Sequence, residues 1–296
     1  MLQDLINAVA LGSIYLLFAL GMSLAWGTIG ILNFAHGSIF MFSAFTAYLI
    51  VNAVKLPLVA VILIAAIAGA VMSVAVQVLA FEPILRRAKD SRAAEMQILI
   101  GGIGVAGVPL AIAQHYTKSN PFGFTNSSFK VDTFDLGGVR ITSVQIIIIA
   151  LALVLGVGIA RWLQVSRHGL ALRSIGVDPE VSSIMGVDRR RLALTTMTIA
   201  GALAGLAGAL LTYNLGALTP ESGETLILKA FAAIVVGGVG SMAGVVVGSY
   251  VLAIAETVVL TQTSGLWVDA VSFGLIFLVL MFRTQGLFGR REVRRT

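Results

Sequence analysis

The sequence predicts an all-α polytopic integral membrane protein, and three observations support this fold class. Only 11% of the 296 residues are charged and 58% are hydrophobic, whereas soluble domains carry roughly 25% charged residues. The mean hydropathy is +0.97. Apolar runs close to the ~20 residues that cross a bilayer as a helix recur along the chain, and 32 glycines suit helices that pack closely in lipid.

Successive apolar segments define the expected membrane helices. The first segment follows no basic N-terminal region and is too long for a cleavable signal, so we interpret it as a membrane span. The sequence between 225 and 260 is interrupted by glycines, which favours a broken or re-entrant helix there. We expect about 8–10 membrane helices. The candidates are residues 5–27, 31–53, 58–80, 96–116, 143–163, 192–214, 225–240, 241–260 and 266–282.

The basic residues indicate which side of the membrane each loop faces. Of the 20 Lys and Arg residues, four lie in 82–95, six in 161–191 and five in 283–296. Even numbers of expected spans separate these segments, and positively charged loops stay in the cytoplasm. We therefore predict two cytoplasmic loops and a cytoplasmic tail, with an external loop at 117–142, an external N-terminus, and one transmembrane domain over 1–296. The net charge of +6 then reflects topology, so we expect membrane lipids and no nucleic acid as partners.

The second basic loop contains the signals of a short helix. Asp178 is a favourable N-cap, and Pro179 fits the first helical position, where a missing N–H has no consequence. Gly186 fits the left-handed residue that follows a helix end. Asp188 can cap the next helix, so the loop is expected to hold a short, rigid helix between two capped ends.

One edge of this short helix is apolar, because Val181, Ile184 and Met185 share a face at helical spacing. Two interpretations fit that edge. The helix is either a connector on the membrane surface, with arginines that contact lipid phosphates, or a docking helix whose apolar edge enters a groove on a cytoplasmic partner.

Two polar segments interrupt the apolar sequence. "NFAHGS" begins an expected span, and polar groups at membrane depth usually face a cavity or the bundle interior. Asn33, His36 and Ser38 are therefore candidates to line a translocation pathway, the alternative being interior hydrogen bonding. Glu221, within "TPESGET" at an outward end, is a candidate for the pathway entrance, the alternative being a plain turn.

Lys229 and Glu256 are the ionisable residues deepest in the expected spans. An unpaired charge there is unfavourable, so we expect the two to pair with each other or to face a water-filled pathway. Structural pairing is the preferred interpretation over contact with a substrate.

The glycine-rich stretches indicate packing. "GGVGSMAG" has no lysine, and no G-x-x-x-x-G-K-[ST] sequence occurs anywhere in the chain, so a phosphate-binding loop is excluded. We expect close helix contacts through small residues. The residues concerned are Gly201, Gly205, Gly208, Gly240, Gly244 and Gly248.

Enzymatic and metal-binding functions lack their usual residues. The chain has no cysteine, and its three histidines (His36, His115 and His168) lie far apart in sequence. No G-x-S-x-G or H-E-x-x-H motif is present. We therefore expect no catalytic residues and no metal site.

Four sequence blocks, in order, resemble the permease subunits of bacterial branched-chain amino acid ABC importers, and the similarity is greatest to the LivH-type subunit. The blocks are distributed in the same order from residue 18 to residue 289. They are "FALGMSLAWGTIGILNFAHGSIFMFSAF" at 18–45, "RHGLALRSIGVDPEVSSIMGVDRRRLAL" at 167–194, "LTPESGETLILKAFAAIVVGGVGSMAGVVVGSYVLAIAE" at 218–256 and "MFRTQGLFG" at 281–289.

The resemblance implies a type II ABC importer permease fold in the bacterial inner membrane. It implies four kinds of partner: a homologous LivM-like second permease subunit, two ABC ATPase subunits, a periplasmic solute-binding protein and lipids. It also implies that ATP and Mg bind to the ATPase partners and that this chain binds no cofactor. The implied ATPase-coupling helix comprises Asp178, Pro179, Glu180, Val181, Ile184, Met185 and Gly186.

The resemblance favours leucine, isoleucine and valine as solutes, and two kinds of alternative stay open. Similar permeases serve urea, amides or other small solutes. An ion-driven secondary transporter would need intramembrane carboxylates as cation sites, and only Glu256 clearly qualifies; a channel-like pore is a third possibility.

Overall fold

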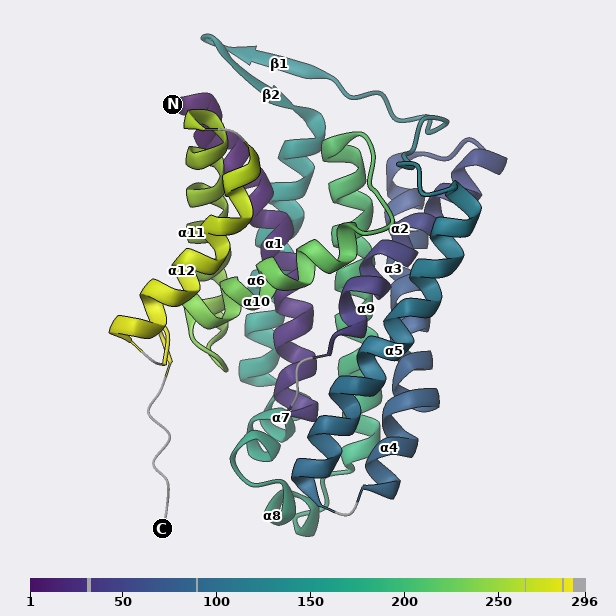
Figure 1. Ribbon diagram of the computed structural model, residues 1–296, viewed down its shortest axis with the longest axis vertical. Coiled ribbons are helices and arrows are strands. Elements are labelled where there is room, and N and C mark those ends of the chain that lie inside the picture. The colour runs from purple at the N-terminus through teal and green to yellow at the C-terminus, as the bar shows by residue number, and fades with distance from the viewer. Residues whose placement is uncertain (31–32, 89, 264, 284, 290–296) are drawn as a thin grey trace. The chain divides into compact units, whose positions relative to one another are not determined.

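The computed structural model describes residues 1–30, 33–88, 90–263, 265–283 and 285–289 (Figure 1). Helices dominate these residues, which confirms the predicted all-α polytopic class. The elements are α1 (Leu2–Ile29), α2 (Ala35–Ala53), α3 (Leu58–Val76), the π-helix η1 (Gln77–Phe81), α4 (Glu82–Arg87), α5 (Ser91–Thr117), β1 (Thr133–Leu136), β2 (Val139–Thr142), α6 (Ser143–Val165), α7 (Arg167–Val177), α8 (Pro179–Ile184), α9 (Arg189–Leu215), α10 (Ser222–Gly237), α11 (Met242–Gln262), the 3₁₀-helix η2 (Gly265–Trp267) and α12 (Val268–Phe282).

Seven helices of the described residues are long and apolar enough to cross a membrane, and each overlaps a predicted span. The two remaining predicted spans, 225–240 and 266–282, are shorter helices. With 16 residues, α10 extends about 24 Å, less than the ~30 Å of a hydrocarbon core. The chain breaks between α10 and α11, where Gly238 and Gly240 have positive φ angles of 107° and 80°. The predicted interruption within 225–260 is therefore present. The seven long helices lie at Leu2–Gly27, Ala35–Ala53, Leu58–Arg87, Ala93–Thr117, Ser143–Val165, Arg189–Leu215 and Met242–Gln262.

The chain divides into two compact units. Unit 1 contains 1–23, 131–156 and 228–296, and unit 2 contains 24–130 and 157–227. The interpretation of 1–296 as one transmembrane domain stays a prediction. Part of the predicted tail, residues 284 and 290–296, lies outside the described residues.

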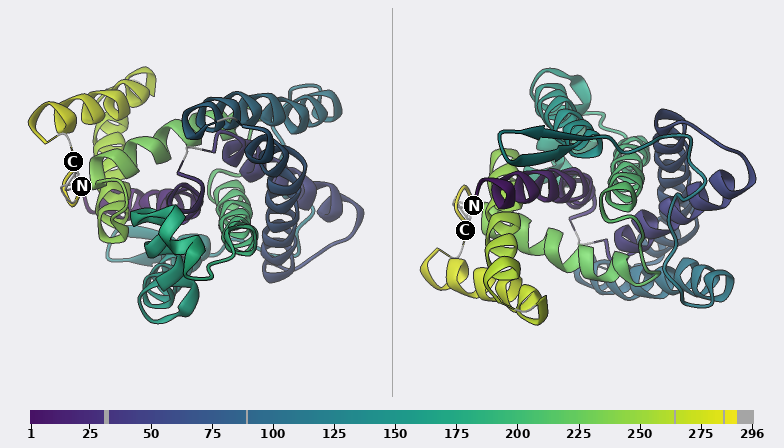
Figure 2. Two further views of the ribbon diagram at one scale, coloured as in Figure 1. Left: turned by 90° about the horizontal axis from the view of Figure 1, so that it is seen from below. Right: turned by 90° about the horizontal axis from the view of Figure 1, so that it is seen from above.

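Unit 2 is built around α9, which packs against α2 and α3; the end-on views show α9 beside α3 (Figure 2). Glycines allow this approach. A Cβ atom built on Gly201 would overlap the carbonyl oxygen of Gly69, and one built on Gly69 would overlap that of Gly201. Gly205 meets the carbonyl of Ala65 in the same way, and Gly208 meets that of Phe40. The predicted packing role of these α9 glycines is confirmed.

The two ends of unit 2 collect different loops. At the start of α9, the Arg190 Nε atom lies 2.8 Å from the Glu82 Oε1 atom of α4, so the two basic loops meet there. Near the other end of α9, Phe122 and Leu218 exchange backbone hydrogen bonds of 2.8 and 2.9 Å. Since α9 has 27 residues, these ends are about 40 Å apart. This separation agrees with the predicted opposite sides.

In unit 1 the N-terminal residues contact the loop that was predicted to be external. Arg140 of β2 donates its backbone N–H to the Gln3 side chain at 2.8 Å, and Gln3 donates back to the Arg140 carbonyl at 2.9 Å. The hairpin turns at Gly137 and Gly138, whose φ angles are 65° and 88°, the conformation of a two-residue type I′ turn. The hairpin was not predicted, but its position beside Gln3 agrees with an external N-terminus.

Helices α10 and α11 approach each other through small residues. Gly244 packs against the backbone of Gly237, and Gly248 against that of Ala233, as predicted. The prediction was wrong for Gly240, because α10 ends at Gly237 and Gly240 lies in the following turn with open space around it.

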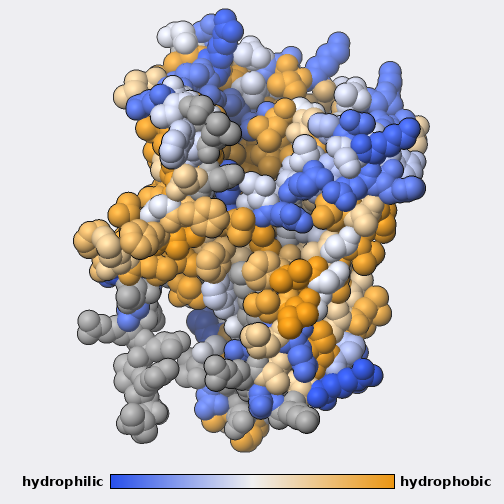
Figure 3. All heavy atoms as spheres, in the orientation of Figure 1, coloured by the Kyte–Doolittle hydropathy of each residue, from blue (hydrophilic) through white to orange (hydrophobic). Residues whose placement is uncertain are grey.

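Apolar side chains cover the exposed face of α5. Along α5, in unit 2, hydrophobic side chains separate hydrophilic ones at its two ends (Figure 3). The exposed apolar residues of this helix include Met96, Ile100, Ile103, Val108 and Ile112. This pattern is typical of a helix surrounded by lipid.

Candidate functional site

The short helix α8 has the caps that its sequence predicts. The Asp178 Oδ1 atom accepts the backbone N–H of Val181 at 3.0 Å. Gly186 has a φ of 89°, and its N–H bonds to the Ser183 carbonyl at 3.0 Å. The side chains of Pro179 and Glu180 lie outside what the structure describes. The predicted boundaries of this helix are confirmed.

The apolar edge of helix α8 is exposed at the surface of the structure. Ile184 is 83% exposed and Met185 80%, and Val181 is also exposed. Ser182, by contrast, is buried, and its hydroxyl donates to the Asp178 carbonyl at 2.7 Å. One face of the helix is therefore buried and the other is exposed.

A rigid link joins α8 to the core of unit 2. Only Val187 and Asp188 separate the αL residue Gly186 from α9, and the Asp188 carboxylate accepts the N–H groups of Arg190 and Arg191 at 3.0 and 3.1 Å. Before α8, the helix α7 starts at the N-cap Ser166, whose hydroxyl accepts the Gly169 N–H at 2.9 Å. Sequence reasoning missed α7, although a serine N-cap was its signal.

The two polar segments "NFAHGS" and "TPESGET" meet in unit 2. A Cβ atom built on Gly37 would overlap the Gly223 carbonyl, and one on Gly223 would overlap the Gly37 carbonyl. Residues that are more than 180 positions apart in the sequence therefore touch backbone to backbone where α2 and α10 begin.

The candidates in the first segment lie in the interior. Asn33 lies just before α2, and its Oδ1 atom accepts the Ala35 N–H at 3.0 Å. His36 is fully buried, and Ser38 donates to the Ala35 carbonyl at 2.9 Å. Interior hydrogen bonding is thus shown for Asn33 and Ser38, and a pathway role for the three residues stays a prediction.

Glu221 lies at the exposed end of the second segment. Its Oε1 atom accepts a hydrogen bond of 2.7 Å from the Gln114 side chain of α5. This bond, the largest cause, holds the pKa of the Glu221 carboxyl below its ordinary value. Gln114 was not singled out from the sequence, since residues 107 positions apart give no local signal.

In unit 1, Lys229 and Glu256 form the predicted ion pair, with 3.0 Å between Nζ and Oε2. Two further groups, which sequence reasoning missed, complete the contact. Tyr15 of α1 donates to Oε2 at 2.7 Å, and Ser272 of α12 donates to Oε1 at 2.7 Å. Both oxygens of the buried carboxylate are therefore occupied, and four helices meet at one charge.

Among the described residues, no group of three or more His, Asp or Glu side chains could hold a metal ion. His115 lies in the last turn of α5, and His168 stacks on Trp162 with ring centroids 6.1 Å apart.

Comparison with known proteins gives consistent matches over nearly the whole chain. Residues 5–280 match the family described as "Branched-chain amino acid transport system / permease component". The high-affinity branched-chain amino acid permease protein BraD of Pseudomonas aeruginosa is 30% identical, with 99% of this chain and 97% of BraD aligned. The LivH permease protein of Escherichia coli K12 is 29% identical over the same shares.

A third relative is less similar to this chain. The probable branched-chain amino acid permease LivH of Methanocaldococcus jannaschii is 26% identical, with 92% of this chain and 84% of that protein aligned. No solved structure matches the chain at a significant level.

Proposed function

Because the chain belongs to the family of branched-chain amino acid transport system permease components, we propose that it forms part of the membrane pathway of an ATP-driven importer for leucine, isoleucine and valine. It is a LivH-type, multi-pass permease of the inner membrane. Support comes from alignment over 97% of the lengths of BraD and LivH and from seven helices that are long and apolar enough to cross a membrane among the described residues.

One observation carries the ATP-driven part of the proposal, namely the bare apolar edge of α8. Ile184 and Met185 are more than three-quarters exposed on a helix that the basic residues assign to the cytoplasm. An apolar edge on a rigid helix fits a groove on a protein partner. We assign this edge to an ABC ATPase subunit, with Asp178 and Gly186 fixing the helix at its two ends.

Coupling in this scheme runs along the backbone. ATP binding to the partner can change the permease only if the ATPase binds one of its conformations more tightly than the other. Force on α8 would pass through Gly186 and the Asp188 cap to α9. The nucleotide and Mg would be bound by two ATPase subunits, and this chain would need no cofactor of its own.

The translocation pathway is proposed to pass the contact between α2 and α10. His36 directly precedes Gly37, and Ser38 directly follows it. Glu221 lies two residues before Gly223. A conformational change that separates Gly37 from Gly223 would make these polar side chains accessible to a solute. A periplasmic binding protein and a LivM-like second permease subunit would complete the importer.

The geometry of Glu256 argues against an ion-driven secondary transporter. A cation site needs carboxylate oxygens that are free to coordinate, and here both oxygens of Glu256 accept hydrogen bonds from Tyr15, Lys229 and Ser272. Urea or amide transport within the same importer class is the alternative solute assignment, and it shares every other part of the proposal.

The test is reconstitution of the permease with its second permease subunit and ATPase subunits in proteoliposomes, with the binding protein supplied at the external side. Labelled leucine should accumulate only with ATP, and unlabelled isoleucine and valine should compete whereas urea should not. Uptake driven by an ion gradient without ATP would contradict the proposal. Uptake of urea in place of leucine would contradict the solute assignment alone.

A further inference from the structure

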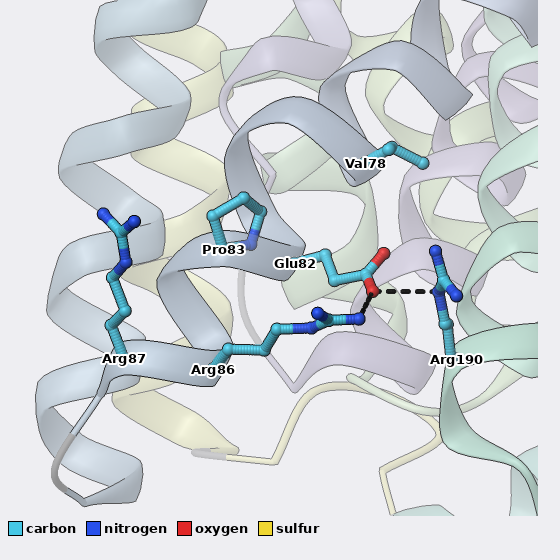
Figure 4. Close-up of a pocket in the computed structure, with 6 residues that line it drawn as sticks. All are labelled: Val78, Glu82, Pro83, Arg86, Arg87 and Arg190. Atoms are coloured by element: carbon cyan, nitrogen blue, oxygen red, sulfur yellow. Dashed lines mark hydrogen bonds and ion pairs between the residues drawn. The ribbon is translucent and has the colours of Figure 1, made fainter.

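A cationic pocket lies at the end of unit 2 where the two basic loops meet. Its volume is about 330 Å³. Figure 4 shows Glu82 between Arg86 and Arg190, while Arg87 points away from that ion pair. Apolar side chains, three arginines and one carboxylate line the pocket, namely Val78, Glu82, Pro83, Arg86, Arg87 and Arg190.

The pocket carries more positive charge than its own carboxylate can neutralise. The Oε1 atom of Glu82 pairs with both Arg86 and Arg190, and Oε2 is buried without a hydrogen-bond partner among the described residues. Arg87 makes no ion pair or hydrogen bond with any residue that the structure describes. Three guanidinium groups against one carboxylate leave an excess of two positive charges beside the membrane.

An apolar stripe on the same continuous helix leads to this pocket. Val59, Leu63, Ile67 and Val71 are exposed at four-residue spacing along α3. Exposed apolar residues continue in the π-helix η1 with the pocket residue Val78 and with Leu79, which is eight residues after Val71. Apolar surface suited to an acyl chain therefore ends directly at guanidinium groups.

We propose that this pocket binds the phosphate of an anionic phospholipid from the cytoplasmic leaflet, with an acyl chain of that lipid along the α3 stripe. Guanidinium groups bind phosphate oxygens in a bidentate manner, and basic pockets beside cytoplasmic helix ends attract anionic lipids. Arg87 supplies the unpaired guanidinium, and Glu82 holds Arg86 and Arg190 in place and reduces their charge. A free phosphate or a nucleotide would use the guanidinium groups but not the apolar stripe.

The test uses the full-length permease purified in detergent, titrated with dioleoylphosphatidylglycerol or with dioleoylphosphatidylcholine. Lipid binding is followed by thermal unfolding and by native mass spectrometry. The wild type should bind the anionic dioleoylphosphatidylglycerol more tightly than dioleoylphosphatidylcholine. Arg87→Gln should weaken binding of the anionic lipid about fivefold, the equivalent of the ~1 kcal/mol that one basic residue contributes at a charged membrane surface. Equal binding of both lipids by the wild type would overturn the proposal.

Two further variants separate lipid recognition from a general change in the protein. Arg140→Gln removes the same charge from the hairpin in unit 1 and should leave the lipid preference unchanged. Glu82→Gln should increase the preference for the anionic lipid, because it releases two guanidinium groups, whereas a purely structural role of Glu82 would not produce that increase. An unchanged preference in Arg87→Gln would overturn the proposal.

Two arms distinguish other sources of negative charge. Inorganic phosphate or soluble glycerol phosphate at the lipid's half-saturating concentration should not displace the lipid, and displacement would assign the pocket to a small anion. In the assembled importer, Arg87→Gln should leave ATPase recovery unchanged. Reduced ATPase recovery with unchanged lipid binding would assign the pocket to a protein interface and overturn the lipid proposal.

Discussion

Lys229 of α10 and Glu256 of α11 form a 3.0 Å ion pair inside apolar sequence, 27 residues apart in the chain. Tyr15 and Ser272 bring α1 and α12 to the same carboxylate. Buried ion pairs contribute little net stability compared with apolar residues, but removal of one partner is strongly unfavourable. The pair therefore makes four helices of unit 1 depend on one another.

Neutralising one member of this pair should destabilise the permease. Lys229→Met leaves the buried carboxylate without its cation, and we expect a loss of about 3–5 kcal/mol in the free energy of unfolding. The double variant Lys229→Met/Glu256→Leu should recover a large part of that loss. Denaturant unfolding in detergent measures both. If the loss in the double variant equalled the sum of the losses in Lys229→Met and Glu256→Leu, the two residues would act separately.

The hydroxyl of Ser272 should contribute a smaller amount. Ser272→Ala removes one hydrogen bond to Glu256, and we expect a loss of about 1–3 kcal/mol, because the bond involves a charged group. Ser249→Ala is the matched control, since the buried Ser249 hydroxyl has no hydrogen-bond partner among the described residues. That control should be neutral or slightly stabilising, and equal effects of the two substitutions would contradict the assigned geometry.

The contact between Gly37 and Gly223 should tolerate no side chain. Gly37→Ala places a methyl group on the Gly223 carbonyl, and we expect a loss of about 1–3 kcal/mol from overpacking together with reduced transport. Gly107→Ala on α5 meets nothing within 4 Å, so it should be neutral or stabilising because alanine favours a helix. Thermal unfolding and leucine uptake compare the pair of variants.

A negative charge on the edge of α8 should prevent ATPase docking. Ile184→Asp would bury an unpaired carboxylate in the proposed groove, and a loss of about 3 kcal/mol corresponds to more than a hundredfold weaker association. Pull-down with the ATPase subunits measures this, and membrane insertion should be unchanged. Val131→Asp, in the segment assigned to the external side, is the matched control. Equal ATPase recovery with Ile184→Asp would favour the alternative in which α8 only contacts lipid.

The αL residue after α8 gives an independent test of the same interface. Gly186→Ala must adopt a φ of 89°, which is unfavourable by about 1–2 kcal/mol for a residue with a Cβ atom. Gly176→Ala in α7 has no positive φ and open space around it. Only the Gly186 variant should lower the coupling between ATP hydrolysis and leucine uptake in proteoliposomes. A similar loss in both would indicate a general effect of changes in this loop.

The sequence predicts much of this architecture where the signal is local. Capping residues and a glycine stop define α8 because their hydrogen bonds connect neighbours three residues apart. The pairing of Lys229 with Glu256 follows from the small number of partners available within apolar sequence. Uncharged partners carry no such restriction, so Tyr15 and Ser272 could not be selected among the five tyrosines and the many serines of the chain.

Other features were missed for different physical reasons. The hairpin has a Gly137–Gly138 turn signal, but its strands are only four residues each. Their pattern is weak compared with that of the long apolar segments on either side. Contacts such as that of Gln114 with Glu221 depend on the relative positions of the helix ends in the folded protein. The π-helix at 77–81 adds one residue to a helical turn, and its amino-acid composition does not distinguish it from an α-helix.

The glycine contacts between α3 and α9 have a mechanical consequence. Gly69 and Gly201 each face the other's carbonyl, so the two backbones touch with no side chain between them that could change rotamer and absorb a displacement. The two helices should therefore move as a single lever during the transport cycle. If α8 docks the ATPase as proposed, a displacement of α8 would reach α9 at Asp188 and would move α3 together with α9, because no rotamer change at this glycine contact could absorb it.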